Sequence, residues 1–133
     1  MFENEIDRPN QQMKKFIHFD GDDVGNHLEL LLLDGRIDEA AALSDQITDA
    51  MWELRKSLEQ IPGLHIHLFG GDDLIAAFAM NSISKSKLND LRHDFKLRCG
   101  VTISVGVGSS VQDALINSRR AKLSGKDQVV GSF

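Results

Sequence analysis

The sequence predicts an α+β fold of the ferredoxin-like type, in which two βα units enclose a central hairpin and both helices lie on one face of an antiparallel sheet. Three observations predict this fold. Apolar and polar residues alternate in three short segments, apolar residues recur every three or four positions in longer segments, and a link of only four residues joins one alternating segment to a short apolar run. The expected order of elements is βαββαβα, followed by an edge strand.

The first half of the chain predicts a strand and a long, interrupted helix. Residues 1–13 are polar and lack periodicity, so we expect a flexible N-terminal arm. Residues 15–20 (KFIHFD) alternate and predict a strand that ends in Asp20. A helical stretch follows, with a break at Asp34-Gly35 and an end at Pro62-Gly63.

The second half predicts a hairpin, two further helices and two strands. Residues 65–69 (HIHLF) and 74–79 (LIAAFA) are joined by Gly-Gly-Asp-Asp, a link short enough for an antiparallel hairpin with two acids at its tip. Ser110 and Asp113 resemble a capping box, which predicts the start of the last helix. The remaining elements are a helix at 84–99, a strand at 101–107, a helix at 110–125 and an apolar edge strand at 129–130.

One face of the predicted sheet is polar. The apolar positions of each strand are expected to pack under the helices, since alternate residues of a strand point to the same face. The opposite face is too polar for a buried core, so we expect it to be open to a ligand or to a second subunit. Its side chains are His18, His65, His67, Thr102 and Ser104.

Composition restricts the class of protein. The 133 residues fit one domain, which we place at 14–133, and 41% apolar with 26% charged residues is ordinary for a globular protein. A net charge of −5 disfavours binding to duplex nucleic acid, because the phosphate backbone is bound mainly through Lys and Arg. With a single cysteine, no signal-peptide core and no membrane-length apolar run, a cytoplasmic protein without a membrane role is expected.

Three acids are the strongest candidates for catalysis. Asp20 ends the first strand, which in this topology lies beside the hairpin, so its carboxylate can approach Asp72 and Asp73. Like charges brought close raise one another's pKa, and a divalent cation offsets that cost. Mg²⁺ binds through carboxylates and substrate phosphates, which fits such a cluster. The glycines that let a phosphate approach the backbone are Gly21, Gly70 and Gly71.

Other charged residues near these acids have two interpretations each. Asp22 and Asp23 either contact the nucleotide and its metal or cap the following helix. Lys122 and Lys126 are the best local basic pair for a triphosphate, and they equally complement the dipole at the end of the last helix.

Three histidines raise a separate alternative. His18, His65 and His67 share one strand face and suggest a transition-metal site, such as one for zinc. Histidines at alternate positions of an exposed strand are more often ordinary polar surface, so zinc is the minor interpretation.

Taken together, the motifs resemble those of a known family. FDGDD on the first strand, FGGDDLIAAF at the hairpin, and SVGVG followed by DALINSRRAKLSGKDQVV are similar to the GGDEF diguanylate cyclases and to the palm domain of the large subunit of type III CRISPR complexes. The resemblance covers about residues 15–131. As a bare palm with GGDD in place of GGDEF, the chain resembles most the minimal CRISPR polymerases, stand-alone palm proteins thought to make cyclic nucleotide signals in anti-phage defence.

The resemblance implies roles for individual residues. It implies that Asp20 and Asp72 coordinate Mg²⁺ or Mn²⁺ together with the Gly21 carbonyl oxygen, and that Asp73 supports this metal site. Diguanylate cyclases read guanine with an Asn eight residues after the first Asp, and Leu28 holds that position here, which favours ATP over GTP. The expected nucleotide and cofactor contacts are Gly21, Asp22, Asp23, Gly70, Gly71, Lys122 and Lys126.

The activity that the resemblance implies is nucleotidyl transfer. Nucleoside triphosphates would condense into a cyclic di- or oligonucleotide with release of pyrophosphate, and the two reciprocal bonds of a cyclic dinucleotide imply a homodimer or higher homo-oligomer. Two rival functions stay open: a palm enzyme that acts on the purine ring of GTP, and a nucleotide-binding regulatory module without turnover. A scaffold role is weaker, because no large exposed apolar patch is expected.

Overall fold

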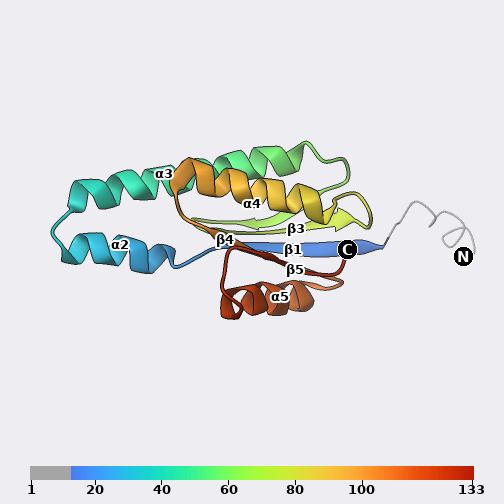
Figure 1. Cartoon of the computed structure of the whole chain (residues 1–133). Helices are drawn as coiled ribbons and strands as arrows, with labels where there is room; N and C mark the ends of the chain where they lie inside the picture. Colours follow the sequence, from blue (N-terminus) through green and yellow to red (C-terminus); the bar gives the residue numbers. More distant parts are fainter. Residues whose placement is uncertain (1–12) are drawn as a thin grey trace, which may run out of the picture.

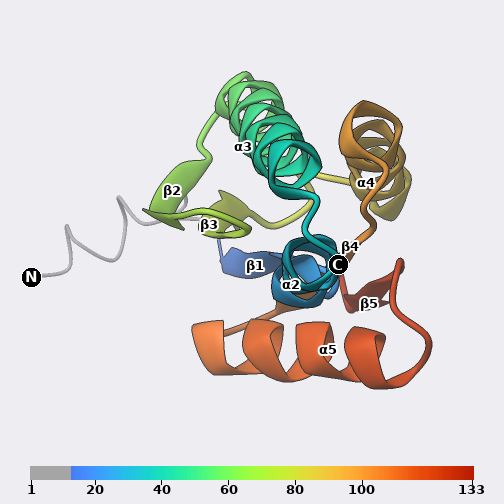
Figure 2. The ribbon, with the colours of Figure 1, turned by 90° about the vertical axis from the view of Figure 1, so that its left-hand side faces the viewer.

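The computed structural model describes residues 13–133 and confirms the predicted α+β fold. The expected N-terminal arm lies outside the described residues, apart from Met13. The strands form one sheet in the order β2-β3-β1-β4-β5 (Figures 1 and 2), with every neighbouring pair antiparallel except β4 and β5. Their bounds are β1 (Lys14–Gly21), β2 (His65–Phe69), β3 (Asp73–Ala79), β4 (Ile103–Gly108) and β5 (Val129–Gly131).

The helices begin and end close to the predicted positions. Gly35, with a φ of 73°, separates the first two helices, and Gly100, with a φ of 77°, ends the third. The Ser84 and Ser110 hydroxyl oxygens accept hydrogen bonds from backbone N–H groups of the first turns that follow them, as the capping pattern predicted. The bounds are α2 (Val24–Leu33), α3 (Ile37–Glu59), α4 (Lys85–Cys99) and α5 (Val111–Leu123).

The core lies between the sheet and helices α3 and α4, which cover the same face (Figure 2). Ile17 and Phe19 of β1 are fully buried there, as the alternation of the strand predicted. α3 contributes buried residues at spacings of three and four along its length. The larger core side chains are Ile17, Phe19, Ile47, Met51, Leu54, Leu58, Leu74, Phe78, Leu88, Phe95, Ile103 and Val105.

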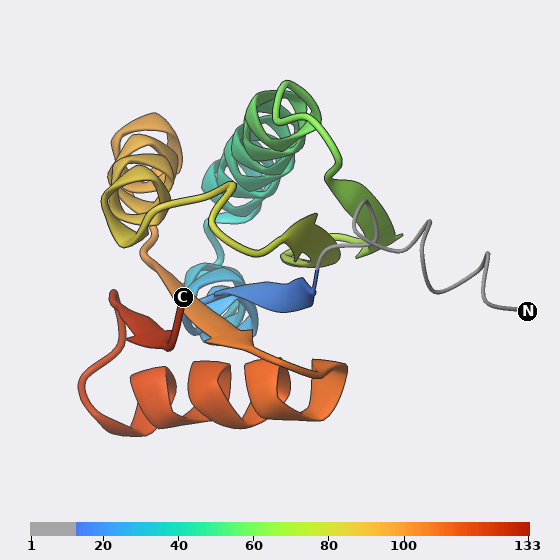
Figure 3. The same cartoon turned by 90° about the vertical axis from the view of Figure 1, so that its right-hand side faces the viewer.

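Helix α5 lies on the opposite face, where it covers β1 and β4 (Figures 2 and 3). The expectation that this face is open is therefore wrong at its centre, where His18 and Ser104 are 6% and 0% exposed. The face stays open over β2, where His65 and His67 are exposed.

Small residues allow α5 to approach the sheet this closely. Ala114, Ser118 and Ala121 are the buried residues of α5, and β4 presents Gly106 to them. A Cβ atom at Gly106 would lie 2.1 Å from the carbonyl oxygen of Ala114 and 2.2 Å from the backbone nitrogen of Ser118. The face of β4 that carries small residues is therefore a close contact with α5 and not an open surface.

Helix α2 and the first turns of α3 project beyond the end of the sheet (Figure 1). α2 buries none of its residues, although it ends in four consecutive leucines. Leu30, Leu33 and Ile37 are 62%, 76% and 67% exposed, so apolar side chains gather at this tip, contrary to expectation. Within residues 13–133, no helix combines the length and the hydropathy needed to cross a membrane.

We predict that Gly106→Ala lowers the free energy of unfolding by about 1–3 kcal/mol, because the added methyl group displaces the α5 backbone. Chemical denaturation measures this change. Gly25→Ala is the matched control, since a Cβ in that exposed position of α2 meets no atom within 4 Å. It should stabilise the protein by up to ~1 kcal/mol through helix propensity. A Gly106→Ala protein as stable as the wild type would contradict the close contact.

Candidate functional site

The end of β1 meets the tip of the hairpin formed by β2 and β3. Asp20 lies opposite Asp73 of β3 on one side and opposite Ser104 of β4 on the other. The Gly21 N–H donates to the carbonyl oxygen of Asp72 at 2.8 Å. Asp20, Asp72 and Asp73 therefore lie together, as the topology predicted.

The glycines of the site lie where the backbone passes close to these acids. A Cβ at Gly21 would lie 2.8 Å from Val24 Cγ2 and 3.4 Å from the Asp72 carbonyl oxygen. Gly70 and Gly71 form the tip of the hairpin, where the Gly70 N–H donates to the Asp73 carbonyl oxygen at 3.0 Å. The tip is exposed, so a ligand can reach the acids from this side.

Burial raises the pKa of the Asp20 carboxyl, because partial removal from water disfavours the charged form. The neighbouring carboxylates of Asp72 and Asp73 raise this pKa further. Lys122 and His18 act in the opposite direction but do not cancel the rise. A cation at the end of β1 would therefore favour the ionised form of Asp20.

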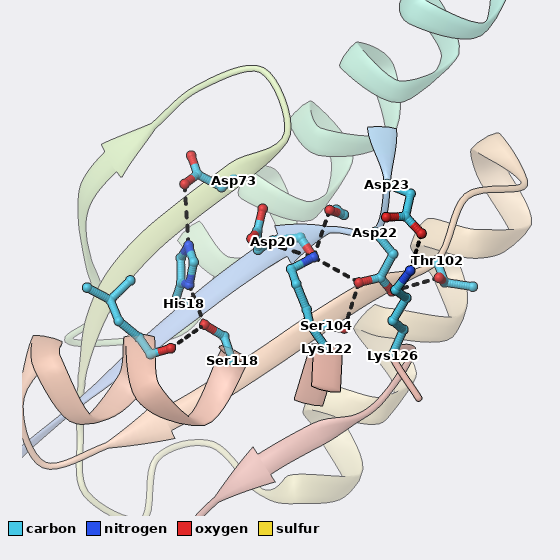
Figure 4. Close-up of polar contacts among 12 residues, drawn as sticks. His18, Asp20, Asp22, Asp23, Asp73, Thr102, Ser104, Ser118, Lys122 and Lys126 are labelled. Carbon is cyan, nitrogen blue, oxygen red and sulfur yellow. Dashed lines mark hydrogen bonds and ion pairs between the residues drawn. The ribbon is translucent and has the colours of Figure 1, made fainter. Parts of the chain in front are cut away.

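Lys122 of α5 supplies part of the positive charge at this position (Figure 4). Its Nζ atom lies 2.9 Å from the Gly21 carbonyl oxygen and 3.2 Å from the Asp20 carbonyl oxygen. It also lies 2.9 Å from Asp22 Oδ1 and 3.5 Å from Asp20 Oδ2. Lys122 thus holds the backbone at the end of β1, and it contacts the carbonyl oxygen that the family resemblance assigns to a metal.

Asp22 is buried behind the three acids and anchors the site. Its carboxylate accepts hydrogen bonds from Thr102 Oγ1 and Ser104 Oγ, both at 2.7 Å, and from the Asp127 N–H at 3.1 Å. Burial alone would raise the pKa of Asp22, but the hydrogen bonds from Thr102, Ser104 and Lys122 outweigh it and lower the pKa. Asp22 therefore connects β1 with β4, α5 and the turn before β5, a role that neither sequence-based interpretation described.

Asp23 and Lys126 form an ion pair at the surface of the site. The hydrogen bond from Lys126 lowers the pKa of the Asp23 carboxyl. Asp23 precedes α2 in a left-handed conformation, with a φ of 55°, and its side chain makes no capping hydrogen bond. The capping interpretation of Asp23 is therefore wrong.

His18 lies next to the hairpin acids and apart from the other strand histidines. Its Nε2 atom lies 3.3 Å from Asp73 Oδ2, and its Nδ1 atom lies 2.7 Å from Ser118 Oγ (Figure 4). His65 and His67 pair with each other on the exposed strand β2, with ring centroids 4.5 Å apart. The three histidines do not form one cluster, so the suggested three-histidine zinc site is wrong.

Two cavities flank the acids. One of about 290 Å³ lies between α2, α3 and the hairpin tip, and it is lined by Val24, Gly25, Leu28, Ser44, Ile47, Thr48, Gly71 and Asp72. The other, of about 170 Å³, lies against α5 and is lined by His18, Asp20, Leu115, Ser118, Arg119 and Lys122. Asp72 thus belongs to the first cavity and Asp20 to the second.

Two cavity residues, Ser44 and Thr48, were not identified from the sequence. They lie one helical turn apart on α3, whereas Arg119 belongs to the cluster of cations at the end of α5, which the sequence showed and which equally complements the helix dipole. Isolated polar residues such as Ser44 and Thr48 form no local motif. The spacing of Ser44 and Thr48 was the only available signal, since residues four apart share a helix face.

The oxygen donors of the site fit a divalent cation. Asp20, Asp72 and Asp73 offer carboxylate oxygens and Gly21 offers a carbonyl oxygen, the ligands that Mg²⁺ and Mn²⁺ prefer. Burial, and to a lesser extent Asp72 and Asp73, raise the pKa of Asp20, so a bound cation would favour its ionised form. Asp20, Asp72 and Gly21 would hold such a cation, which supplies charge to a reacting phosphate.

One family model matches nearly the whole chain. The minimal CRISPR polymerase domain matches residues 16–132. No curated protein sequence matches this chain.

Solved structures share the fold. A chain of the Csm1–Csm4 cassette crystallised with one ATP is 18% identical, with a TM-score of 0.67 over 90% of this chain and 21% of that chain. The active GGEEF domain of a diguanylate cyclase from Vibrio cholerae is 12% identical, with a TM-score of 0.56 over 96% and 87%. A bacterial light-regulated adenylyl cyclase is 13% identical, with a TM-score of 0.52 over 83% and 71%.

We predict that Asp22→Ala lowers the free energy of unfolding by about 3 kcal/mol, because it removes the nearest carboxylate partner of the part-buried Lys122 and the acceptor of the buried Ser104 hydroxyl. Folding lowers the pKa of Asp22, so its contribution is complete above the ordinary value of 3.8 and is lost as pH falls through the folded-state pKa. The stability difference between wild type and Asp22→Ala should shrink correspondingly in acid. Denaturant titrations across this pH range measure it.

Asp23→Ala is the control for this prediction, because it removes an adjacent carboxylate whose ion pair with Lys126 is exposed. Its unfolding transition should stay close to that of the wild type. Equal losses of stability in Asp22→Ala and Asp23→Ala would show that Asp22 is not the anchor of the site.

Proposed function

Since the chain belongs to the minimal CRISPR polymerase family, we propose that it is a metal-dependent nucleotidyltransferase that makes a cyclic nucleotide signal. Its substrates are nucleoside triphosphates, with ATP favoured and GTP as the alternative. The product is a cyclic di- or oligonucleotide, released with pyrophosphate and used in anti-phage defence. The observation that carries the proposal is the convergence of Asp20, Asp72 and Asp73 beside two cavities.

The larger cavity is suited to the base of the substrate. Val24 and Leu28 give it apolar walls, and Ser44 and Thr48 give it hydroxyl groups, a mixture typical of small-molecule sites. Leu28 offers no hydrogen bond to the edge of a base, which supports ATP over GTP. Asp72 lines the same cavity, so the phosphates of a nucleotide bound there would lie near the acids.

Basic residues on the α5 side are suited to the triphosphate. Arg119 and Lys122 line the smaller cavity together with Asp20. Lys126 lies nearby in its surface ion pair with Asp23, an interaction weak enough to be exchanged for a phosphate. We propose that Lys122 and Lys126 bind the triphosphate and that Arg119 supplies a further positive charge.

In the proposed reaction, a ribose hydroxyl of one nucleotide attacks the α-phosphorus of another. The new O–P bond forms as the bond to pyrophosphate breaks, and the hydroxyl proton passes to water. A Mg²⁺ or Mn²⁺ held by Asp20, Asp72 and the Gly21 carbonyl oxygen would lower the pKa of that hydroxyl and neutralise the leaving pyrophosphate. The Gly21 carbonyl oxygen also accepts from Lys122, and its second lone pair leaves it able to bind a cation.

A homodimer or higher homo-oligomer follows from the product. A cyclic dinucleotide contains two bonds made by reciprocal attacks, and two chains that face each other about a two-fold axis present two sites at once. The polar sheet face is not the meeting surface at its centre, because α5 covers it there. The open hairpin tip near Gly70 and Gly71 gives one chain access to the acids of the other.

Product analysis tests the proposal directly. The protein is incubated with each nucleoside triphosphate and with Mg²⁺ or Mn²⁺, and the products are identified by mass spectrometry and linkage-specific nuclease digestion. A cyclic product with pyrophosphate supports the proposal. A ring-opened purine supports the rival palm chemistry, and bound but unchanged nucleotide supports a regulatory module.

We predict that Asp72→Asn abolishes product formation and leaves the fold intact. The side chain lies on an accessible hairpin tip, and loss of its charge relieves repulsion with Asp20. Turnover at saturating Mg²⁺ and thermal unfolding without metal measure the two effects. Asp113→Asn, at an exposed position of α5, is a control that should retain wild-type turnover. Wild-type yield from Asp72→Asn would remove Asp72 from the metal site.

We predict that an Asp72→Asn chain inhibits the wild type in mixed dimers when the two proteins are mixed and their subunits exchange. A mixed dimer completes one bond and stops, so the cyclic product should fall more steeply than the fraction of wild-type sites, and a linear dinucleotide should accumulate. Product ratios are followed by mass spectrometry after native mass spectrometry has shown exchange. Strict proportionality without a linear intermediate would mean that one chain closes the ring alone.

A further inference from the structure

His18 is held in one orientation by a hydrogen-bond network below the acids. His18 lies in the middle of β1 and is buried, with 6% of its surface exposed. Ser118 Oγ lies 2.7 Å from His18 Nδ1 and 3.0 Å from the Leu115 carbonyl oxygen. When the Ser118 hydroxyl donates to that carbonyl oxygen, it accepts from Nδ1, and the Nε2 lone pair then points away from α5, toward the hairpin.

The Nε2 lone pair faces another electron-pair donor. Asp73 Oδ2 lies 3.3 Å from Nε2. An imidazole nitrogen and a carboxylate oxygen this close together can serve as two ligands of one cation, as well as hydrogen-bond partners. Asp20 adds a third donor, because ligand atoms of His18, Asp20 and Asp73 all lie within 4.8 Å of one another.

We propose that His18 Nε2, Asp20 and Asp73 form a binding site for a first-row transition-metal dication such as Mn²⁺, Co²⁺ or Zn²⁺. The imidazole nitrogen favours such cations over Mg²⁺, which takes oxygen ligands, and it favours Co²⁺ and Zn²⁺ more than Mn²⁺, for which the two carboxylates are the better ligands. Ser118 is a positioning residue, since a hydrogen bond to the second ring nitrogen sets the tautomer and orientation of a histidine ligand. This inference deepens the proposed function. A catalytic role for the site rests on the proposed function, whereas metal binding at the site does not.

The site is reached from the smaller cavity. His18 and Asp20 both line this cavity of about 170 Å³, so water or a phosphate oxygen has access to a cation held there. The cation that the family resemblance implies would instead be held by Asp72 and the Gly21 carbonyl oxygen, together with Asp20. Asp20 is common to both sets, so the proposed site is a second cation position on the side of the acids that faces α5.

Metal titrations without nucleotide test the proposal. The Asp72→Asn chain is used as the background, because it removes a ligand of the implied site and leaves His18, Asp20 and Asp73 in place. Co²⁺ binding is followed by visible absorption, and nitrogen coordination to bound Mn²⁺ is detected by electron spin-echo spectroscopy. We expect one tightly bound cation with a nitrogen ligand.

Three further substitutions in this background separate ligation from structure. His18→Gln should weaken Co²⁺ binding by at least about 10-fold and remove the nitrogen signal, and Ser118→Ala should weaken binding by about 10- to 100-fold while keeping that signal. His67→Gln is the matched control, since His67 lies two strands away on the exposed β2 and should change neither. Circular dichroism checks that each variant is folded.

Two outcomes would overturn the site. One is an unchanged Co²⁺ affinity in both His18→Gln and Ser118→Ala. The other is the absence of a nitrogen signal from the Asp72→Asn chain, which would mean that only a proton lies between His18 and Asp73. Because these measurements use no nucleotide, a protein that binds the metal but forms no cyclic product would reject the proposed function alone.

Discussion

The buried carboxylate of Asp22 is the interaction on which the geometry of the site depends. It accepts hydrogen bonds from two hydroxyl groups of β4 and its flank, from Lys122 of α5 and from the backbone before β5. A carboxylate satisfied by several donors in a buried position is stable as an anion. The end of β1, where Asp20 stands, is thereby attached to three parts of the chain that are distant in sequence.

The acids next to this anchor are arranged for a cation that comes from outside. Asp22 has its charge balanced within the protein, whereas the pKa of Asp20 remains raised despite Lys122 and His18. Asp20 and Asp22 therefore differ in role although only one residue separates them. Asp22 stabilises the fold, whereas added positive charge favours the ionised form of Asp20. Such a division is typical of sites where part of the folding free energy is given up for ligand binding.

Local patterns predicted the elements and the acid cluster, but not the side on which the last helix packs. The strand alternation, the Gly-rich hairpin and the Ser110 cap are properties of neighbouring residues, and all are present in the structure. The position of α5 depends on the fit of Gly106 to the α5 backbone, which is a contact between elements. The role of Asp22 depends on Thr102 and Ser104, 80 and 82 residues away, so nothing in its own segment distinguishes it from Asp20 or Asp23.

Helix α2 has a thermodynamic consequence for the larger cavity. None of the ten residues of α2 is fully buried. A helix this short is marginally stable in water unless it packs against the rest of the protein. Local unfolding of α2 therefore requires less free energy than unfolding of the core helices α3 and α4. Val24 and Leu28 belong to α2 and form one wall of the cavity. A molecule that binds only to the folded wall shifts the local equilibrium by mass action, so occupancy of the cavity and order in α2 rise together.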